Sequence, residues 1–70
     1  MLDLDGRIAM GRRHVESGVD ILDRQRRLIE RRHALKLDVT AAEDLLDSFE
    51  ASQAIFEDDL FRLLKQRDGK

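Results

Sequence analysis

The sequence predicts an all-α fold, an antiparallel two-helix hairpin that we expect to dimerise into a four-helix bundle. Apolar residues recur every seven positions in each half of the chain, at Ile8, Val15, Leu22 and Ile29 and again at Ala42, Phe49, Phe56 and Leu63. Such heptads are typical of helices that pack with a left-handed twist, as in coiled coils. A chain of 70 residues buries a small share of its surface when it folds alone, and without cysteine it cannot add disulfides. Association with another chain is then the expected source of further stability.

The chain is expected to form one helical-hairpin domain over residues 1–70. Apolar spacings of three and four, with no proline, predict a first helix at about 6–35 and a second at about 41–67, joined by a turn at about 36–40. The clearest boundary is a Thr-x-x-Glu capping box formed by Thr40 and Glu43. In such a cap, the Thr40 hydroxyl accepts from the Glu43 amide and the Glu43 carboxylate accepts from the Thr40 amide.

The short turn makes the two helices antiparallel neighbours and predicts which residues meet between them. Folding about residue 37 or 38 pairs positions whose numbers sum to about 75, which places Gly18 opposite Phe56 and Val15 opposite Leu60. The hairpin core is expected to contain Val15, Gly18, Leu22, Ile29, Leu45, Leu46, Phe49, Phe56, Leu60 and Leu63.

Two residues in this stripe have two interpretations each. Gly18 either makes room for a bulky residue of the other helix or weakens the N-terminal part of its own helix. Gln25 lies between Leu22 and Ile29, where a buried amide can fix register and oligomeric state, or else it only borders a drifting apolar stripe.

A second apolar row lies beside the first and would remain wet in a monomer. It comprises Ile21, Leu28 and Leu35, and Ile55 lies off the main row of the second helix. These four residues form the predicted oligomer interface, and a dimer of hairpins is the simplest closed solution. The alternative is a broad stripe with ordinary surface leucines.

Charge is segregated between the two halves of the chain. Residues 6–36 hold nine Lys/Arg and four Asp/Glu, a balance of +5, whereas residues 40–64 hold one Arg and seven Asp/Glu, a balance of −6. Opposite signs on adjoining helices suggest an internal match, with Arg31 and Arg32 near Asp44 and Glu43.

These patterns favour a non-enzymatic interaction or regulatory module that self-associates and binds a protein partner. The alternative is a small nucleic-acid-associated protein that uses the basic face of residues 24–36, through Arg24, Arg27 and Arg31. No aromatic residue is interleaved there for base stacking, so we expect nucleic-acid binding less than self-association.

Residues for chemistry are scarce, and we expect no catalytic residue, cofactor or metal, and no enzyme activity. A weaker alternative is a di-iron carboxylate bundle, since Glu30 and His33 form a Glu-x-x-His pattern on a helix, although Glu30 turns away from the heptad stripe. The longest run free of charge, residues 51–56, is far too short for a membrane span, and we expect a cytoplasmic protein.

Three short motifs carry a resemblance to a known group. They are His14-x-x-x-Gly18, Arg24-Gln25 with Leu28-Ile29, and Thr40-x-Ala42-Glu43-x-Leu45-Leu46-x-x-Phe49-Glu50-x-Ser52. Over roughly residues 14–61 the chain resembles small uncharacterised helical-hairpin proteins of alphaproteobacteria. The resemblance implies a hairpin and no particular activity. Members tend to have a glycine near the end of the first helix, where this chain has Ala34-Leu35-Lys36-Leu37.

Overall fold

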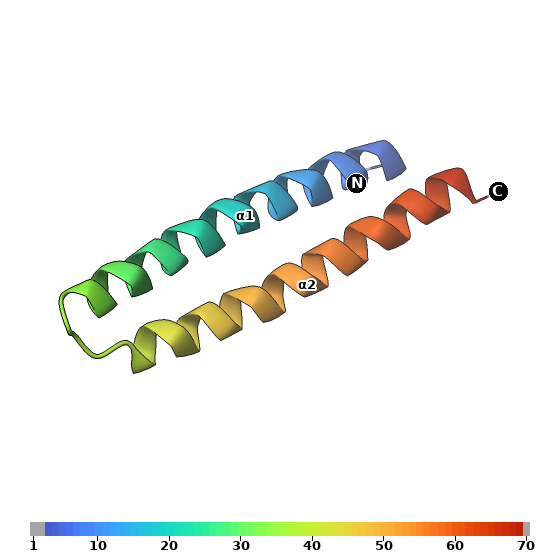
Figure 1. Ribbon diagram of the computed structural model, residues 1–70. Helices are drawn as coiled ribbons and strands as arrows, with labels where there is room; N and C mark the ends of the chain where they lie inside the picture. The colour runs from blue at the N-terminus through green and yellow to red at the C-terminus, as the bar shows by residue number, and fades with distance from the viewer. Residues whose placement is uncertain (1–2, 70) are drawn as a thin grey trace.

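The computed structural model describes residues 3–69 as two long α-helices. Helix α1 spans Leu4–Ala34 and helix α2 spans Thr40–Asp68, and residues 35–39 connect them. The helices lie side by side in opposite directions, with both ends of the chain at the same end of the molecule (Figure 1). The predicted antiparallel hairpin is therefore confirmed, while residues 1, 2 and 70 of the expected domain lie outside the described residues.

Helix α1 begins at a side-chain cap that the sequence supplies locally. The Asp3 carboxylate accepts a hydrogen bond of 2.7 Å from the Gly6 amide, and Asp5 adds negative charge to the first turn. At the other end, Arg31, Arg32 and His33 place basic groups in the last turn. Both arrangements complement the helix dipole, which is positive at its N-terminus and negative at its C-terminus.

Helix α1 ends in a Schellman motif around Lys36. The Leu37 amide donates to the Arg32 carbonyl at 2.8 Å, and the Lys36 amide donates to the His33 carbonyl at 3.0 Å. This geometry places Lys36 at a φ of 58°, in the left-handed region where glycine is the usual residue. The helix thus ends without the glycine that normally signals such a stop.

Replacing Lys36 with glycine is expected to stabilise the hairpin by about 0.5–1 kcal/mol. A side chain in the left-handed region costs about 1–2 kcal/mol, and glycine removes that cost while adding some freedom to the unfolded chain. Urea unfolding at fixed protein concentration measures the change. Lys36→Ala is the control, because it removes the ammonium and keeps the β-carbon; an equal gain from alanine would contradict the backbone explanation.

The start of α2 differs from the expected capping box. Thr40 is already the first helical residue, and its amide and hydroxyl both donate to the Asp38 carboxylate, at 3.0 and 2.8 Å. The Glu43 amide donates to the Val39 carbonyl at 2.8 Å, so the Thr40 hydroxyl does not accept from it. Asp38 supplies the stronger acceptor two residues before the helix, and the predicted Thr40–Glu43 cap was wrong.

Asp38 makes the stability of the hairpin depend on pH in the acid range. Hydrogen bonds from the Thr40 amide and then the Thr40 hydroxyl, helped by the Arg32 charge, hold the pKa of Asp38 below its ordinary value. A pKa lowered by folding means that the carboxylate stabilises the fold above its unfolded pKa of about 4. That contribution is lost as the pH falls through the lower pKa of the folded state.

We therefore expect Asp38→Ala to be less stable than the parent chain at pH 7 and to lose most of that deficit at about pH 2. Thermal unfolding of both chains at the two pH values, at one protein concentration, measures the difference. An equal deficit at both pH values would show that the charge of Asp38 contributes nothing to the cap.

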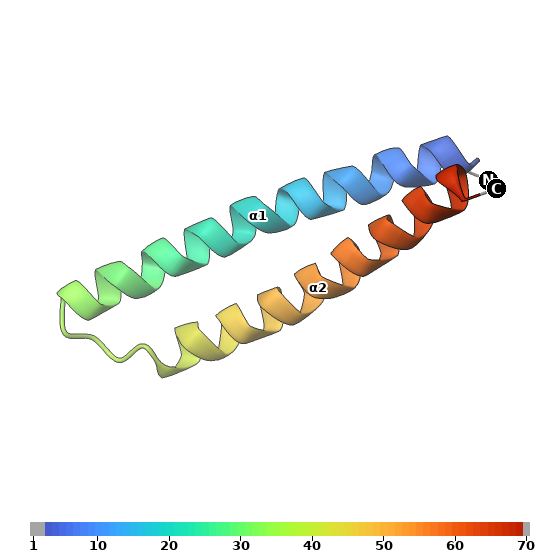
Figure 2. The same ribbon diagram turned by 45° about the vertical axis from the view of Figure 1, so that its right-hand side comes forward.

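The register between the helices is shifted by about one turn from the predicted one. Gly18 lies against Gln53 and Gly11 against Leu60, so facing positions sum to 71 and not to about 75. The cause is the connection, which runs back along the end of α1 so that α2 begins beside its last turns (Figure 2). The Arg32 side chain holds this path by donating to the Asp38 carbonyl at 2.9 Å.

The hairpin is elongated and has almost no closed core. Its extents are 54 × 19 × 14 Å and its radius of gyration is 16.0 Å, against about 11 Å for a compact domain of 70 residues. Among the described residues, Ile8 is the one apolar side chain that is buried, at 4% exposure. Packing between two helices alone therefore leaves most apolar side chains partly exposed to solvent.

Candidate association surface

The seam, where α1 and α2 face each other, is held by two buried glutamines. Gln25 is 7% exposed and its Nε2 donates to the Ala42 carbonyl of α2 at 2.8 Å. Gln53 is 6% exposed and its Nε2 donates to the Val15 carbonyl of α1 at 2.9 Å. Each helix thus sends one amide across the seam to the backbone of the other, and Gln25 does not merely border the stripe.

Gly18 makes the space that Gln53 occupies. A β-carbon built at Gly18 would overlap the Oε1 and Cδ atoms of the Gln53 amide. The Oε1 atom lies directly against the glycine backbone, where it is buried and has no hydrogen-bond partner. The packing interpretation of Gly18 is confirmed, but its partner is Gln53 and not Phe56, as the shifted register requires.

The structure places most of the expected core residues at the seam, but only half-buried. This applies to Val15, Gly18, Leu22, Ile29, Leu46, Phe49, Leu60 and Leu63. Phe56 is more exposed and stacks on the His14 ring, with centroids 5.0 Å apart. Leu45 is exposed and lies beside the seam, so its assignment to the core was wrong.

One side of the seam is polar. There Arg26 and Glu50 form an ion pair between the two helices, at 3.5 Å and with both side chains about half exposed. Such an exposed pair contributes little stability. The expected match of Arg31 and Arg32 with Asp44 and Glu43 is wrong, since residues 3–69 contain no ion pair among these four side chains. Val19 is exposed and apolar on this side, the polar edge, and so is Phe61, which lies eleven residues or about three turns after Glu50.

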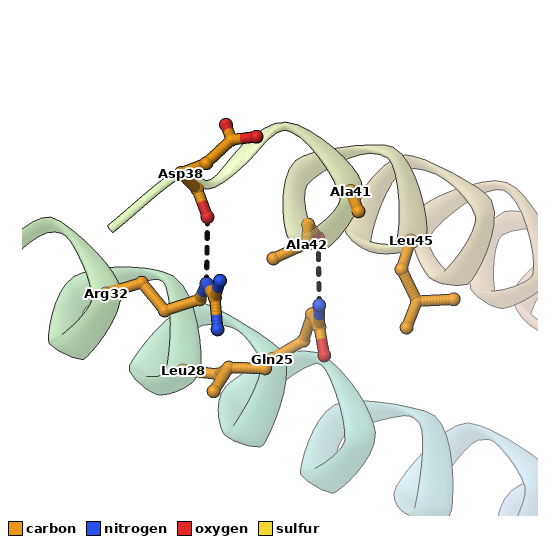
Figure 3. A pocket seen from close by; sticks show the side chains of 7 residues that line it. All are labelled: Gln25, Leu28, Arg32, Asp38, Ala41, Ala42 and Leu45. Carbon is orange, nitrogen blue, oxygen red and sulfur yellow. Dashed lines mark hydrogen bonds between the residues drawn. The ribbon is translucent and has the colours of Figure 1, made fainter.

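The other side of the seam is an apolar edge built from both helices. Leu28 of α1 and Leu45 of α2 line one shallow hollow there, floored by Gln25 and Ala42 and closed at the connection by Arg32 and Asp38 (Figure 3). Ile21 and Leu35 lie seven residues, about two turns, on either side of Leu28, while Met10 precedes Ile21 by eleven residues and Ile55 follows Leu45 by ten, about three turns in each case. We define the apolar edge as Met10, Ile21, Leu28, Leu35, Leu45 and Ile55.

Three of the four residues in the predicted oligomer interface are openly exposed on this edge. Leu35 is 69% exposed and Ile21 is 41% exposed, while Ile55 is also exposed and Leu28 is half-buried. Sequence reasoning missed Leu45 and Met10. The signal for Leu45 was its place three residues after Ala42, which turns it from the seam toward the side where Leu28 lies.

The residues of the other two hypotheses lie away from the apolar edge or at its border. Arg24, Arg27 and Arg31 line one shallow surface hollow with Glu30, and Arg27 is paired with Asp23 at 3.1 Å. Glu30 and His33 are exposed, and residues 3–69 contain no cluster of three or more side chains suited to hold a metal ion. No helix in the same residues is long and apolar enough to cross a membrane.

Comparisons of the chain with protein-family models, with curated proteins and with solved structures found no match.

Proposed function

We propose that this chain is a self-associating interaction module, a homodimer in which the apolar edges of two hairpins cover each other. The observation that carries the proposal is the apolar edge itself. Six large apolar side chains lie on one side of the hairpin, while the ion pair of Arg26 and Glu50 lies on the other. Exposed apolar side chains gathered on one side of a small protein are typical of an interaction site.

The hairpin exposes more surface than a compact monomer of its mass, and the excess is large enough for a protein–protein interface. Its solvent-accessible surface is 5622 Å², whereas a compact monomer of 8.1 kDa exposes about 4500 Å². The excess of about 1100 Å² exceeds the roughly 800 Å² that each partner contributes to a standard interface. A second copy supplies an equal apolar edge, and the pair closes into a four-helix bundle.

Unfolding at several protein concentrations tests whether folding and association are coupled. For a dimer that dissociates on unfolding, we expect the melting temperature to rise by about 5–10 °C over a hundredfold increase in concentration. Circular dichroism at 222 nm follows the transition. A melting temperature independent of concentration, over about 2–200 µM, would contradict the proposal.

A second candidate function is nucleic-acid binding, favoured by the shared exposed surface of Arg24, Arg27 and Arg31. The carboxylates of Asp23 and Glu30 weaken this surface, since Asp23 pairs with Arg27 and Glu30 lines the same hollow. A gel-shift titration with duplex DNA and with single-stranded RNA at about 50 mM salt tests it, because charge-driven binding is strongest in dilute salt. Absence of a shift at micromolar protein would remove this candidate.

A further inference from the structure

We propose that the two hairpins of the dimer lie with their connections at the same end, so that α1 of each copy packs against α2 of its partner. This inference rests on the proposed homodimer. A twofold axis can run in two ways through an interface between two flat hairpins. An axis parallel to the helices sets α1 on the partner's α2, whereas an axis across the helices sets α1 on α1 and α2 on α2.

Charge distinguishes the two arrangements. Residues 6–36 carry a balance of +5 and residues 40–64 a balance of −6. Within the described residues, the ion pair of Arg26 and Glu50 is the one that joins the two helices, so most of this charge is not matched inside the hairpin. Packing α1 on α1 would bring like charges together, while α1 on α2 pairs opposite charges.

The charges that border the apolar edge show the same asymmetry. On α1, Arg24 and Arg31 each follow an edge residue by three positions. On α2, Asp44 directly precedes Leu45, and Asp59 follows Ile55 by one helical turn. With the axis parallel to the helices, facing numbers again sum to 71, so Arg24 and Arg31 lie within about one turn of the height of the partner's Asp44, which favours this dimer over the opposed one.

Side-chain size fits the same arrangement. A twofold axis parallel to the helices leaves the position of each residue along the helix direction the same in both copies. The rule that facing numbers sum to 71 therefore also holds between α1 and the partner's α2. Ile21 then lies level with the turn between the partner's Ser48 and the partner's Ser52, where α2 has small side chains. A bulky row facing small residues is how helices interdigitate.

The hollow at the connection end fits the same register. Leu28 lies level with the turn between the partner's Ala41 and the partner's Leu45, two residues that line this hollow in each copy. The hollow of Figure 3 is therefore the place that receives Leu28 of the second copy. Charge thus favours this arrangement, and in it Ile21 and Leu28 lie beside the small side chains of the partner's Ser48, the partner's Ser52 and the partner's Ala41.

Pulsed dipolar spectroscopy on spin-labelled single-cysteine variants tests this arrangement. The natural chain has no cysteine, so each label reports one site. His33→Cys labels the connection end of α1 and Asp5→Cys labels the open end, and both residues are exposed and outside the apolar edge. These sites lie 28 residues apart on one helix, about 42 Å at 1.5 Å per residue.

We expect a distance within about 30 Å between the two His33 labels, and likewise between the two Asp5 labels, since equal heights meet across a bundle of four helices. A mixture of the two variants is expected to give distances beyond about 40 Å between copies. Short distances in the mixture and long ones in each single variant would overturn the arrangement while leaving the dimer intact. No distance between copies, with the mass of one chain, would overturn the proposed function as well.

Discussion

Replacing Ile21 with glutamate is expected to convert the dimer into hairpin monomers at micromolar concentration. Ile21 lies near the middle of the apolar edge. A glutamate there would bury an unpaired charge in each of the two copies of the dimer. We expect the dissociation constant to rise at least a hundredfold, which corresponds to about 3 kcal/mol. Size-exclusion chromatography with light scattering across a dilution series measures this constant.

Val19→Glu is the matched control for this substitution. Val19 is also a β-branched residue of α1, two positions away, and is 57% exposed on the polar edge. Both substitutions add one negative charge to the same helix, but only the one at Ile21 lies in the proposed interface. Equal dissociation constants for the two variants would place the interface elsewhere, and selective loss of the dimer in Val19→Glu would move it to the polar edge.

Replacing Gly18 with alanine is expected to destabilise the hairpin by about 1 kcal/mol, although alanine normally stabilises a helix by a similar amount over glycine. The new β-carbon would displace the Gln53 amide, which loses its hydrogen bond to the Val15 carbonyl and leaves the seam underfilled. Chemical unfolding at fixed protein concentration measures the change.

Two further variants isolate the cause. Gly11→Ala is the first, because its β-carbon would lie 3.3 Å from the Leu60 methyl group, in tight contact with a flexible side chain that can yield. We expect it to be neutral or stabilising by up to about 1 kcal/mol. In a Gln53→Ala background, Gly18→Ala is expected to become stabilising, since the competing amide is gone. The same loss in both backgrounds would exclude Gln53 as the cause.

The hairpin itself could be predicted because its signal is repeated many times. Four heptads of apolar residues in each half, without proline, leave few alternatives to two paired helices. Helix ends were predicted within two residues, because the apolar spacings of three and four begin and end close to the helices themselves. Features that recur along the chain, or that depend only on neighbouring residues, are the ones that a single sequence predicts best.

The register could not be predicted, because it depends on the shape of the connection. Lys36 adopts a backbone conformation that a lysine does not signal, and Asp38 takes the hydrogen bonds that were expected within the Thr40–Glu43 cap. These two features turn the chain back along α1 and shift facing positions by one turn. The partner of Gly18 was misassigned because of this shift, and Arg32, expected near Glu43, instead donates to the Asp38 carbonyl.

The candidate surface was predicted in part. The row of Ile21, Leu28 and Leu35 follows from seven-residue spacing on one helix, which needs no knowledge of the other. Leu45 joins the same edge only through the relative rotation of the two helices, which depends on the seam. Gln53 was overlooked because the predicted register set Phe56 opposite Gly18, whereas Gln53 fills that space.

The solution mass of the unmodified chain tests the central claim most directly. Sedimentation equilibrium over about 5–200 µM, at physiological salt, gives this mass without labels or substitutions. Association through the apolar edge predicts a species of twice the 8.1 kDa chain mass that dissociates on dilution. A mass of 8.1 kDa throughout that range would show that the apolar edge is not covered by a second copy.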